Sequence, residues 1–444
     1  MPTLARQLRA TDYFTLGWGT MVGVGWLVVM DDWLSRGGAV GALLGFVIGG
    51  ALLFPIGWVY GKLVVAMPDA AGEIAYTSAV FPRAISFATG WMMSLAYFIV
   101  CPWEAVAVGR IAGYIFPALD TIEIYQIAGR PVYLPRLIVG LALTALLTFL
   151  NYRGVRLSAM FQNWTSFGTL ALFVVFVALG ASRGSRTNFA PLFTHTPLVS
   201  ILLVIQIVPY FMTGFESVGK AAEEANPEFH PRGFFRAIWM AILVGILFYA
   251  SIVAAVAFVA PWHGLTGERF MTAVAFQQAL HSRWIVNVIL AAALLSLFKC
   301  FNGNFVAASR LFFALGRRGM ITPRIAAIHR QYQTPSVAVL CVGIATAVCM
   351  LLGDAILVPI TEVGSVACAI GWAAACAAFL AITFRSQTRG AHVKEYAVAG
   401  LGVLVAVALA LMKLVPLIPG HFTIYEWLAL GIWILAGAIA ALMK

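Results

Sequence analysis

Two breaks interrupt membrane-length apolar segments, and each break exposes backbone groups that can bind a small polar molecule. The first segment runs from Phe14 to Trp33 and is broken at Gly23-Val24-Gly25. The second runs from Leu198 to about Val218 and is broken at Pro209 and at Thr213-Gly214-Phe215-Glu216. Because lipid offers no hydrogen-bond partners, a break at mid-membrane is tolerated only where it lines a cavity or is buried in protein. Paired breaks in corresponding places of two halves predict a transporter's substrate site.

The free backbone groups at these breaks suit the two charges of an amino acid. Amides at the N-terminus of the outer half-helix carry a partial positive charge and suit a carboxylate, whereas carbonyls at the end of the preceding half-helix suit an ammonium group. The simpler interpretation is that the glycines only allow close helix packing. We predict that the substrate-binding residues are Met21, Val22, Gly23, Val24, Gly25 and Trp26 in the first segment, and Tyr210, Phe211, Thr213, Gly214 and Phe215 in the second.

Three ionisable residues are predicted inside spans, where a charge costs at least about 2.5–3.5 kcal/mol on insertion scales. Glu216 lies at the start of the inner half of the second broken segment, and Glu104 and Lys299 lie at similar depths in two other spans. One interpretation is a buried Glu104–Lys299 ion pair that only fixes the packing. The other is that these residues act in gating or in coupling to an ion.

Asp31 and Asp32 lie about six residues beyond the first break, near the predicted outer mouth. One interpretation is an acidic funnel that attracts a cationic substrate, such as a basic amino acid or an amine. The other is an exposed pair at a helix end, matched to nearby Arg36.

The composition is that of a chain that crosses a lipid bilayer many times. Of 444 residues, 62% are hydrophobic and 10% are charged, whereas soluble proteins average about 25% charged residues. About twelve stretches are long and apolar enough to cross a hydrocarbon core of roughly 30 Å. They are predicted near residues 12–34, 38–66, 86–116, 135–150, 155–180, 198–220, 234–259, 286–315, 336–353, 355–384, 394–415 and 422–443.

The net charge of +11 is explained by membrane topology rather than by a nucleic-acid partner. When the predicted spans are followed from a cytoplasmic N-terminus, most Lys and Arg fall on the inner side, as the positive-inside rule requires. We therefore expect a multi-pass protein of the cell (inner or plasma) membrane, in contact with the lipid bilayer, with both termini in the cytoplasm. The six cysteines lie within predicted spans and form no CxxC pair, so neither a disulfide nor a metal site is expected.

The predicted spans divide into two repeats and an appended pair. Residues 1–180 hold the first five spans, and residues 181–390 hold the next five; each group begins with a broken helix. Because each group has an odd number of spans, the second repeat is inverted in the membrane. Residues 391–444 hold the last two spans, which we interpret as a scaffold or an oligomer surface; monomer and homodimer both stay open.

Four motifs occur in order at matching positions of these spans: Gly23-Val24-Gly25-Trp26, Pro68-Asp69-Ala70-Ala71-Gly72-Glu73, Phe211-Met212-Thr213-Gly214-Phe215-Glu216 and Ala308-Ser309-Arg310. On these residues the chain resembles the amino acid–polyamine–organocation (APC) transporter superfamily, which has a leucine-transporter-like fold. The first motif is similar to the family's Gly-Ser-Gly-Ile at the break in helix one. The resemblance implies an all-α integral membrane fold of 12 transmembrane helices: a 5+5 inverted repeat with discontinuous helices 1 and 6, plus two C-terminal helices.

The resemblance also implies secondary active transport of amino acids by alternating access, as symport or antiport. In sodium-driven relatives a cation lies between helices one and eight, and in proton-driven relatives a helix-five lysine can take that place. The matching position here is Thr169, whereas Lys299 approaches the same region from helix eight. We therefore predict coupling to a proton rather than to sodium, and no other cofactor. Val24 and Trp26 are bulkier than the family's residues, which predicts a small substrate.

Several other functions compete with amino acid transport. The alternative substrate class is an amine or polyamine that lacks a carboxylate. A channel would show repeated filter loops or rings of like charge, a nutrient sensor would carry a long soluble tail, and an enzyme would need an acid–base or metal constellation. The sequence shows none of these patterns, and its histidines are scattered in loops. We therefore predict a transporter of a small molecule and not an enzyme.

Overall fold

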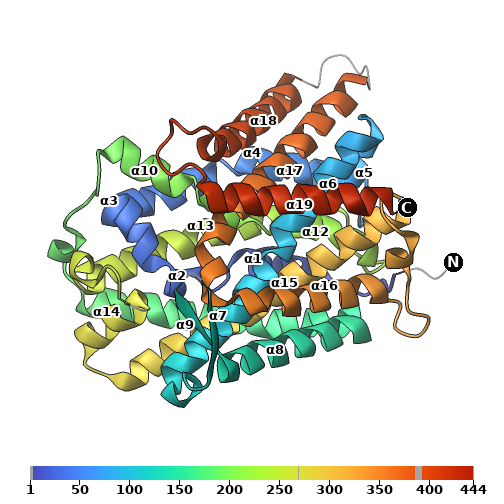
Figure 1. Cartoon of the computed structure of the whole chain (residues 1–444). Helices are drawn as coiled ribbons and strands as arrows, with labels where there is room; N and C mark the ends of the chain where they lie inside the picture. Colours follow the sequence, from blue (N-terminus) through green and yellow to red (C-terminus); the bar gives the residue numbers. More distant parts are fainter. Residues whose placement is uncertain (1–3, 128, 269, 386–392, 444) are drawn as a thin grey trace.

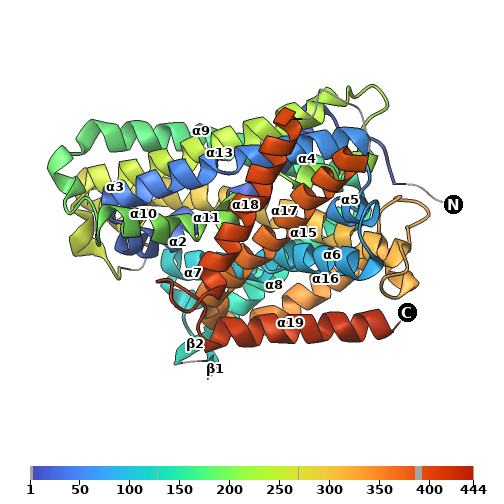
Figure 2. The same ribbon diagram turned by 90° about the horizontal axis from the view of Figure 1, so that it is seen from above.

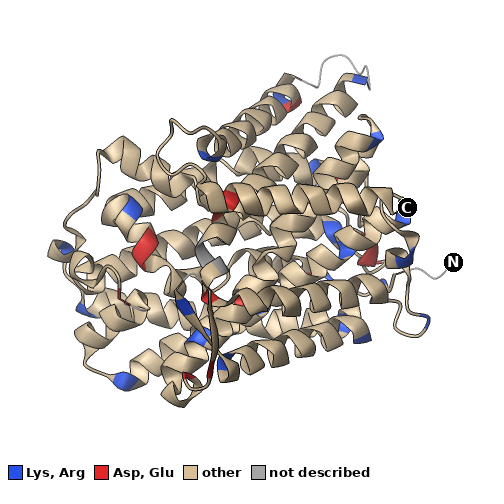
Figure 3. Ribbon diagram, viewed as in Figure 1, with Lys and Arg blue, Asp and Glu red and all other residues tan. Residues whose placement is uncertain are grey.

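The computed structural model describes residues 4–127, 129–268, 270–385 and 393–443. Within these residues the chain is almost entirely helical, and its long helices lie side by side in one bundle (Figure 1). Both described ends of the chain lie at one end of the bundle, here called the terminal face. The other end, which carries α14 (Met271–Leu280), is called the opposite face. Most of the ribbon carries no charged residue (Figure 3), as expected for a bundle in lipid.

The described residues of the first half of the chain form nine helices, one short 3-10 turn and two β-strands. Their bounds are α1 Ala10–Met21, α2 Gly25–Val28, α3 Met30–Ala51, α4 Phe54–Ala66, α5 Glu73–Ser78, α6 Arg83–Phe98, α7 Val100–Ile115, η1 Pro117–Leu119, β1 Glu123–Ile127, β2 Arg130–Tyr133, α8 Leu134–Arg153 and α9 Val155–Arg183. The antiparallel β1–β2 hairpin was not expected from the sequence.

The second half is wholly helical in its described part. Its elements are η2 Arg186–Phe189, α10 Pro197–Ile205, α11 Val208–Met212, α12 Ser217–Lys220, η3 Ala222–Glu224, α13 Arg232–Val259, η4 Trp262–Leu265, α14 Met271–Leu280, α15 Arg283–Arg317, η5 Pro323–Ala326, α16 Ser336–Cys349, η6 Met350–Ile356, α17 Leu357–Arg385, α18 Val393–Leu414 and α19 Ile424–Leu442.

In the described part of the chain, 10 helical stretches are long and apolar enough to cross a membrane, so the chain is a multi-pass membrane protein. They are Met30–Ala66, Arg83–Ile115, Leu134–Arg153, Val155–Arg183, Arg232–Val259, Arg283–Arg317, Ser336–Ala355, Pro359–Arg385, Val393–Leu414 and Ile424–Leu442. The two broken segments are not among them because their helical pieces are short: α1 has 12 residues, and α2 and α12 have 4 each.

A sharp kink inside α3 separates the first two predicted spans. Gly38 has a φ of 69°, in the left-handed region that favours glycine because a Cβ is disfavoured there. A Cβ on Gly38 would also lie 2.6 Å from the Cα of Phe193. The predicted boundary between residues 34 and 38 therefore coincides with a turn inside one assigned helix.

The half-helix α1 runs through the middle of the bundle and contacts α9, α13 and α15. Its residues from Thr15 to Met21 are all buried. Glycines bring the neighbouring backbones close: a Cβ on Gly19 would overlap Gln162 of α9, and a Cβ on Gly303 of α15 would overlap Thr20. Close packing by small residues is therefore a real feature of this core.

The last two helices pack on the outside of the bundle. α18 contacts α17 and α4, and α19 runs along one edge of the bundle (Figure 2). Trp433 of α19 stacks on Trp91 of α6, with ring centroids 4.7 Å apart. Each indole donates a hydrogen bond to the other residue's carbonyl, at 2.9 and 3.1 Å.

Candidate functional site

The first break lies where α1 ends at Met21. Val22 has extended backbone angles, and helical hydrogen bonding resumes with the amide of Leu27, which donates to the carbonyl of Val24. The outer half-helix is itself interrupted at Val29, so α2 is only one turn long. Gly23 has no room for a side chain, because a Cβ there would overlap the Glu104 carboxylate.

Side chains from α13 and α15 already satisfy the carbonyls at this break. Val22 O accepts hydrogen bonds from the Lys299 ammonium and from Ser296 Oγ, and Met21 O accepts one from Tyr249 OH at 3.1 Å. The sequence had suggested that the carbonyls near Met21 and Val22 are free for a substrate ammonium. Instead, the Lys299 ammonium donates a hydrogen bond to the Val22 carbonyl.

The second break lies between α11 and α12. Thr213 is extended and Gly214 has a φ of +133°. A Cβ on Gly214 would lie 2.6 Å from the backbone nitrogen of Met21, so the two breaks touch backbone to backbone. Glu216 caps this break: its carboxylate accepts from Thr213 Oγ1 at 2.6 Å and from the Gly214 amide at 3.1 Å.

Tyr249 of α13 joins the two breaks. Its hydroxyl lies 3.1 Å from Met21 O and 3.0 Å from Phe211 O, and its side chain is buried. One hydroxyl therefore contacts a carbonyl from each broken segment. This residue was missed in the sequence, because a tyrosine inside an apolar span gives no signal of what it contacts.

A small buried cavity of ≈ 20 Å³ lies where the breaks meet, which is enough for roughly one water molecule. It is lined by Thr20, Met21, Gly23, Gly25, Val100, Trp103, Glu104, Tyr210, Phe211, Thr213 and Cys300. Three polar side-chain atoms of this lining have no hydrogen-bond partner among the described residues: Thr20 Oγ1, Glu104 Oε2 and Tyr210 OH. Buried polar atoms without a partner are costly, and these three face one cavity.

The structure brings six of the predicted substrate-binding residues to this cavity and leaves five outside its lining. Those that line it are Met21, Gly23, Gly25, Tyr210, Phe211 and Thr213, and those that do not are Val22, Val24, Trp26, Gly214 and Phe215. Trp26 faces Phe176 of α9 at a ring distance of 5.6 Å, and Phe215 packs against Trp372 of α17 at 5.6 Å.

Glu104 and Lys299 approach the first break separately, and no ion pair between them is among those of the described residues. Lys299 donates to Val22 O and lies 4.4 Å from the centre of the Trp18 ring. The Glu104 carboxylate faces the Val24 amide and the Cys300 thiol. The structure therefore does not contain a direct Glu104–Lys299 ion pair. Each side chain instead contacts a different backbone group of the break.

Thr169 lies on α9 and is buried. Its hydroxyl donates to the carbonyl of Thr165, one turn earlier in the same helix, at 2.8 Å. The side chain is thus satisfied within its own helix and supplies no cation to the break.

On the opposite face, Asp32 pairs with nearby Arg36, and Arg36 Nε lies 2.8 Å from Asp32 Oδ2. Arg36 also reaches Glu362 on α17 at 3.0 Å, and Glu362 pairs with Lys413 on α18. Asp31, its neighbour, is half-buried and has no ion pair among the described residues. These charges connect α3, α17 and α18 rather than forming a simple exposed pair.

On the terminal face, two buried ion pairs join elements that follow the second break to neighbouring helices. Arg310 of α15 donates two hydrogen bonds to Glu224 of η3, at 2.8 and 3.1 Å, and the two side chains are 1% and 2% exposed. Lys220 of α12 pairs with Glu73 of α5, and Tyr60 donates to the same carboxylate at 2.7 Å.

The segment before α1 is held to the same region by its backbone. The amide of Leu8 donates to Glu224 O, and the amide of Asn226 donates to Leu8 O, both at 2.9 Å. Hydrogen bonds thus connect the N-terminal segment, η3 and α15 to one another.

Comparison with known proteins gives the family. A family model described as "Amino acid permease" matches residues 9–439. The chain is 25% identical to the branched-chain amino acid permease BcaP of Bacillus subtilis, over 81% of this chain and 76% of that protein. It is also 25% identical to the methylthioribose transporter of Bacillus subtilis, over 75% and 72% of the two chains. The human Asc-type amino acid transporter 1 is 27% identical over 79% of this chain and 66% of its own.

Proposed function

The chain belongs to the amino acid permease family of the APC superfamily, and we propose that it carries amino acids across the membrane by alternating access. The observation that supports this most directly is the cavity between the two breaks, lined by both broken segments and by three polar atoms without partners. A transporter of amines or polyamines is less favoured, because the matched family and most of the relatives named above are described by amino acids.

We propose that the ten spanning helices and the two broken segments make twelve transmembrane segments. Residues 1–180 and 181–390 are then two inverted repeats, and residues 391–444 add two helices. The equivalent arrangement of the breaks supports this division, since a chain carboxylate engages each one: Glu104 at the first and Glu216 at the second. The terminal face is assigned to the cytoplasm because of the Lys and Arg content of its loops.

The arrangement described here is proposed to be an occluded one. A cavity of ≈ 20 Å³ is too small for an amino acid, so either face must open for exchange. The Arg310–Glu224 pair would separate when the terminal face opens, and the Arg36–Glu362 pair when the opposite face opens. In the arrangement described here, hydrogen bonds join the two charged side chains of each pair.

In this proposal the three unpartnered polar atoms bind the charged ends of the substrate. Glu104 Oε2 accepts from the ammonium group, and the Thr20 and Tyr210 hydroxyls donate to the carboxylate. This differs from our expectation that the amides after Gly23 hold the carboxylate, because Glu104 already faces the Val24 amide. Charge-assisted hydrogen bonds are the strong ones in such a site.

We propose that Lys299 takes the place of a coupling cation and that transport is driven by protons or proceeds by exchange. Its ammonium contacts Val22 O between α1 and α15, whereas Thr169 is bonded within its own helix. A carbonyl at a helix break is a typical cation ligand in transporters.

The test is binding and uptake with the purified protein. We expect thermal stabilisation by an amino acid but not by its decarboxylated amine, and proteoliposome uptake that responds to a pH gradient without sodium. Tyr210→Phe should weaken amino acid binding roughly 10- to 100-fold, the range for a hydrogen bond to a charged group. Tyr76→Phe is the matched control, because it removes another unpartnered buried hydroxyl away from the cavity. Stabilisation by amines alone, or equal losses in the two variants, would contradict the proposal.

A further inference from the structure

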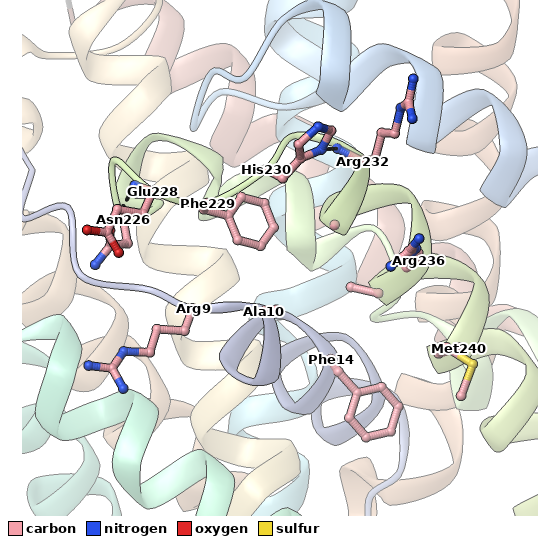
Figure 4. A pocket seen from close by; sticks show the side chains of 12 residues that line it. Arg9, Ala10, Phe14, Asn226, Glu228, Phe229, His230, Arg232, Arg236 and Met240 are labelled. Atoms are coloured by element: carbon pink, nitrogen blue, oxygen red, sulfur yellow. Dashed lines mark hydrogen bonds between the residues drawn. The ribbon is translucent and has the colours of Figure 1, made fainter.

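A groove lies at the terminal face, between the start of α1 and the start of α13 (Figure 4). Its volume is ≈ 830 Å³, far larger than the cavity at the breaks. It does not touch that cavity's lining residues and has no role in the transport proposal.

The rim of the groove is cationic. Arg9, Arg232 and Arg236 line it, and all three side chains are exposed. No ion pair of these arginines is among those of the described residues, whereas Arg310 and Arg317 of α15 and Arg318, which follows that helix, are all paired. Glu228 is the only acidic residue in the lining. The groove thus sets three arginines against one lining carboxylate, and none of the three arginines has an ion pair among those of the described residues.

The floor of the groove is apolar. Phe14 of α1, Phe229, Ala237 and Met240 form the apolar part of the lining, and Phe229 lies between Arg9 and Arg236 in Figure 4. Phe229 is fixed in place by the rings of Tyr13 and Phe234, at centroid distances of 4.9 and 4.6 Å. The groove therefore pairs a charged rim with a hydrophobic base, which a free inorganic anion would not use.

The apolar floor continues along the face of α13 that points out of the bundle. Met240, Leu243 and Leu247 are 47%, 43% and 55% exposed, and together with Arg236 they follow at helical spacings of four, three and four residues. Residues at these spacings share one face of a helix. In a membrane-spanning helix, such an exposed apolar face contacts lipid chains, with the arginine at the level of the head groups.

We propose that this groove binds one anionic phospholipid, with its phosphate held by Arg232 and Arg236 and one acyl chain along Met240, Leu243 and Leu247. Arginines suit phosphate because their planar donors can form two parallel hydrogen bonds. Anionic lipids are enriched at the membrane surface where such basic segments lie. The proposal requires only that the chain is embedded in a membrane, and it does not depend on the transported substrate.

The proposed lipid contacts both walls of the groove. Arg9 immediately precedes α1, and Arg232 and Arg236 lie in the first turns of α13. A lipid in the groove would lie between Arg9 on the α1 wall and Arg232 and Arg236 on the α13 wall. The lipid would therefore favour the closed arrangement of that face, in which α1 and α13 are packed together.

Lipid counting by native mass spectrometry of the full chain tests the proposal. The probes are phosphatidylglycerol and phosphatidylcholine with the same acyl chains. We expect one phosphatidylglycerol to remain bound preferentially, and the double variant Arg232→Gln/Arg236→Gln to weaken its binding roughly 30-fold, as estimated for two arginines near a bilayer surface. The matched control, Arg156→Gln/Arg330→Gln, removes the same charge from two exposed arginines outside the groove and should keep the bound lipid.

The same variants distinguish a lipid site from general surface attraction and from a site for soluble anions. If the control pair loses as much phosphatidylglycerol as the groove pair, surface attraction accounts for the binding and the proposal fails. Thermal-shift measurements with inorganic phosphate form the other arm. Stabilisation by phosphate equal to that by phosphatidylglycerol, and lost in the groove variant, would indicate a site for soluble anions instead. Met240→Asp should weaken the binding of phosphatidylglycerol without changing the thermal shift caused by phosphate. An unchanged affinity for the lipid would also overturn the proposal.

Discussion

Removing one partner of the Arg310–Glu224 pair should open the terminal face. The pair forms two hydrogen bonds of 2.8 and 3.1 Å, and both side chains are almost fully buried. In Arg310→Met, the Glu224 carboxylate would remain buried without its partner, which costs about 3–5 kcal/mol. Opening lets water reach that carboxylate. The equilibrium between closed and open arrangements should therefore shift toward the open one by roughly 150- to 5,000-fold, at about 1.4 kcal/mol per tenfold.

Cys300 can report this shift because it lines the cavity and is buried. In a background where the other cysteines are replaced by alanine, a membrane-impermeant maleimide is added from the terminal side of reconstituted protein. We expect Arg310→Met to label Cys300 much faster than the parent does. The double variant Arg310→Met/Glu224→Leu removes both charges and should label near the parental rate, since an apolar pair of similar volume is often tolerated in place of a buried ion pair.

Two results would refute this reasoning. Parental labelling of Cys300 in a folded, monodisperse Arg310→Met protein would mean that the pair does not hold the terminal face closed. Fast labelling in the double variant would mean that lost packing around Arg310, and not the unpaired charge of Glu224, opens the path.

Three further substitutions test the cavity itself. Lys299→Met should abolish the dependence of uptake on a pH gradient, measured in proteoliposomes, whereas Thr169→Val should keep it; a pH response in the first variant contradicts the coupling role. Gly23→Ala should lower uptake at least tenfold and lower stability by about 1–3 kcal/mol, because its Cβ would overlap Glu104. If the variant keeps wild-type uptake and wild-type thermal unfolding, the close contact is not needed. Tyr249→Phe leaves two buried carbonyls without their shared donor and should lower stability by about 1–3 kcal/mol, read from thermal unfolding, and an unchanged melting temperature would argue against that bridge.

The two breaks could be located from the sequence because glycine, proline and a glutamate rarely occur together inside a long apolar run unless the helix is interrupted there. The long spans could also be predicted, since length and hydropathy are properties of the sequence alone. The Asp32–Arg36 contact follows from a spacing of four residues on one helix. In each case the relevant interaction is local in the sequence.

What could not be predicted depends on contacts between distant segments. The place of Glu104 against Gly23, and of Lys299 at Val22 O, follows from how α7 and α15 pack beside α1. Equal depth in two helices suggested that these residues meet, but depth does not determine which way a side chain points. Trp26 illustrates the same limit: it follows the break directly, yet its ring packs against Phe176.

The backbone contact between the two breaks has a mechanical consequence. At Gly214 no side chain separates the second broken segment from Met21, so this point is a natural pivot for α1. The half-helix has 12 residues and is therefore about 18 Å long at 1.5 Å per residue. A tilt of about 20° at the pivot would move its far end by roughly 6 Å, and the groove between Arg9 and Arg236 would widen by a similar distance. A small rotation beside the cavity is thus geometrically amplified into a displacement at the membrane surface.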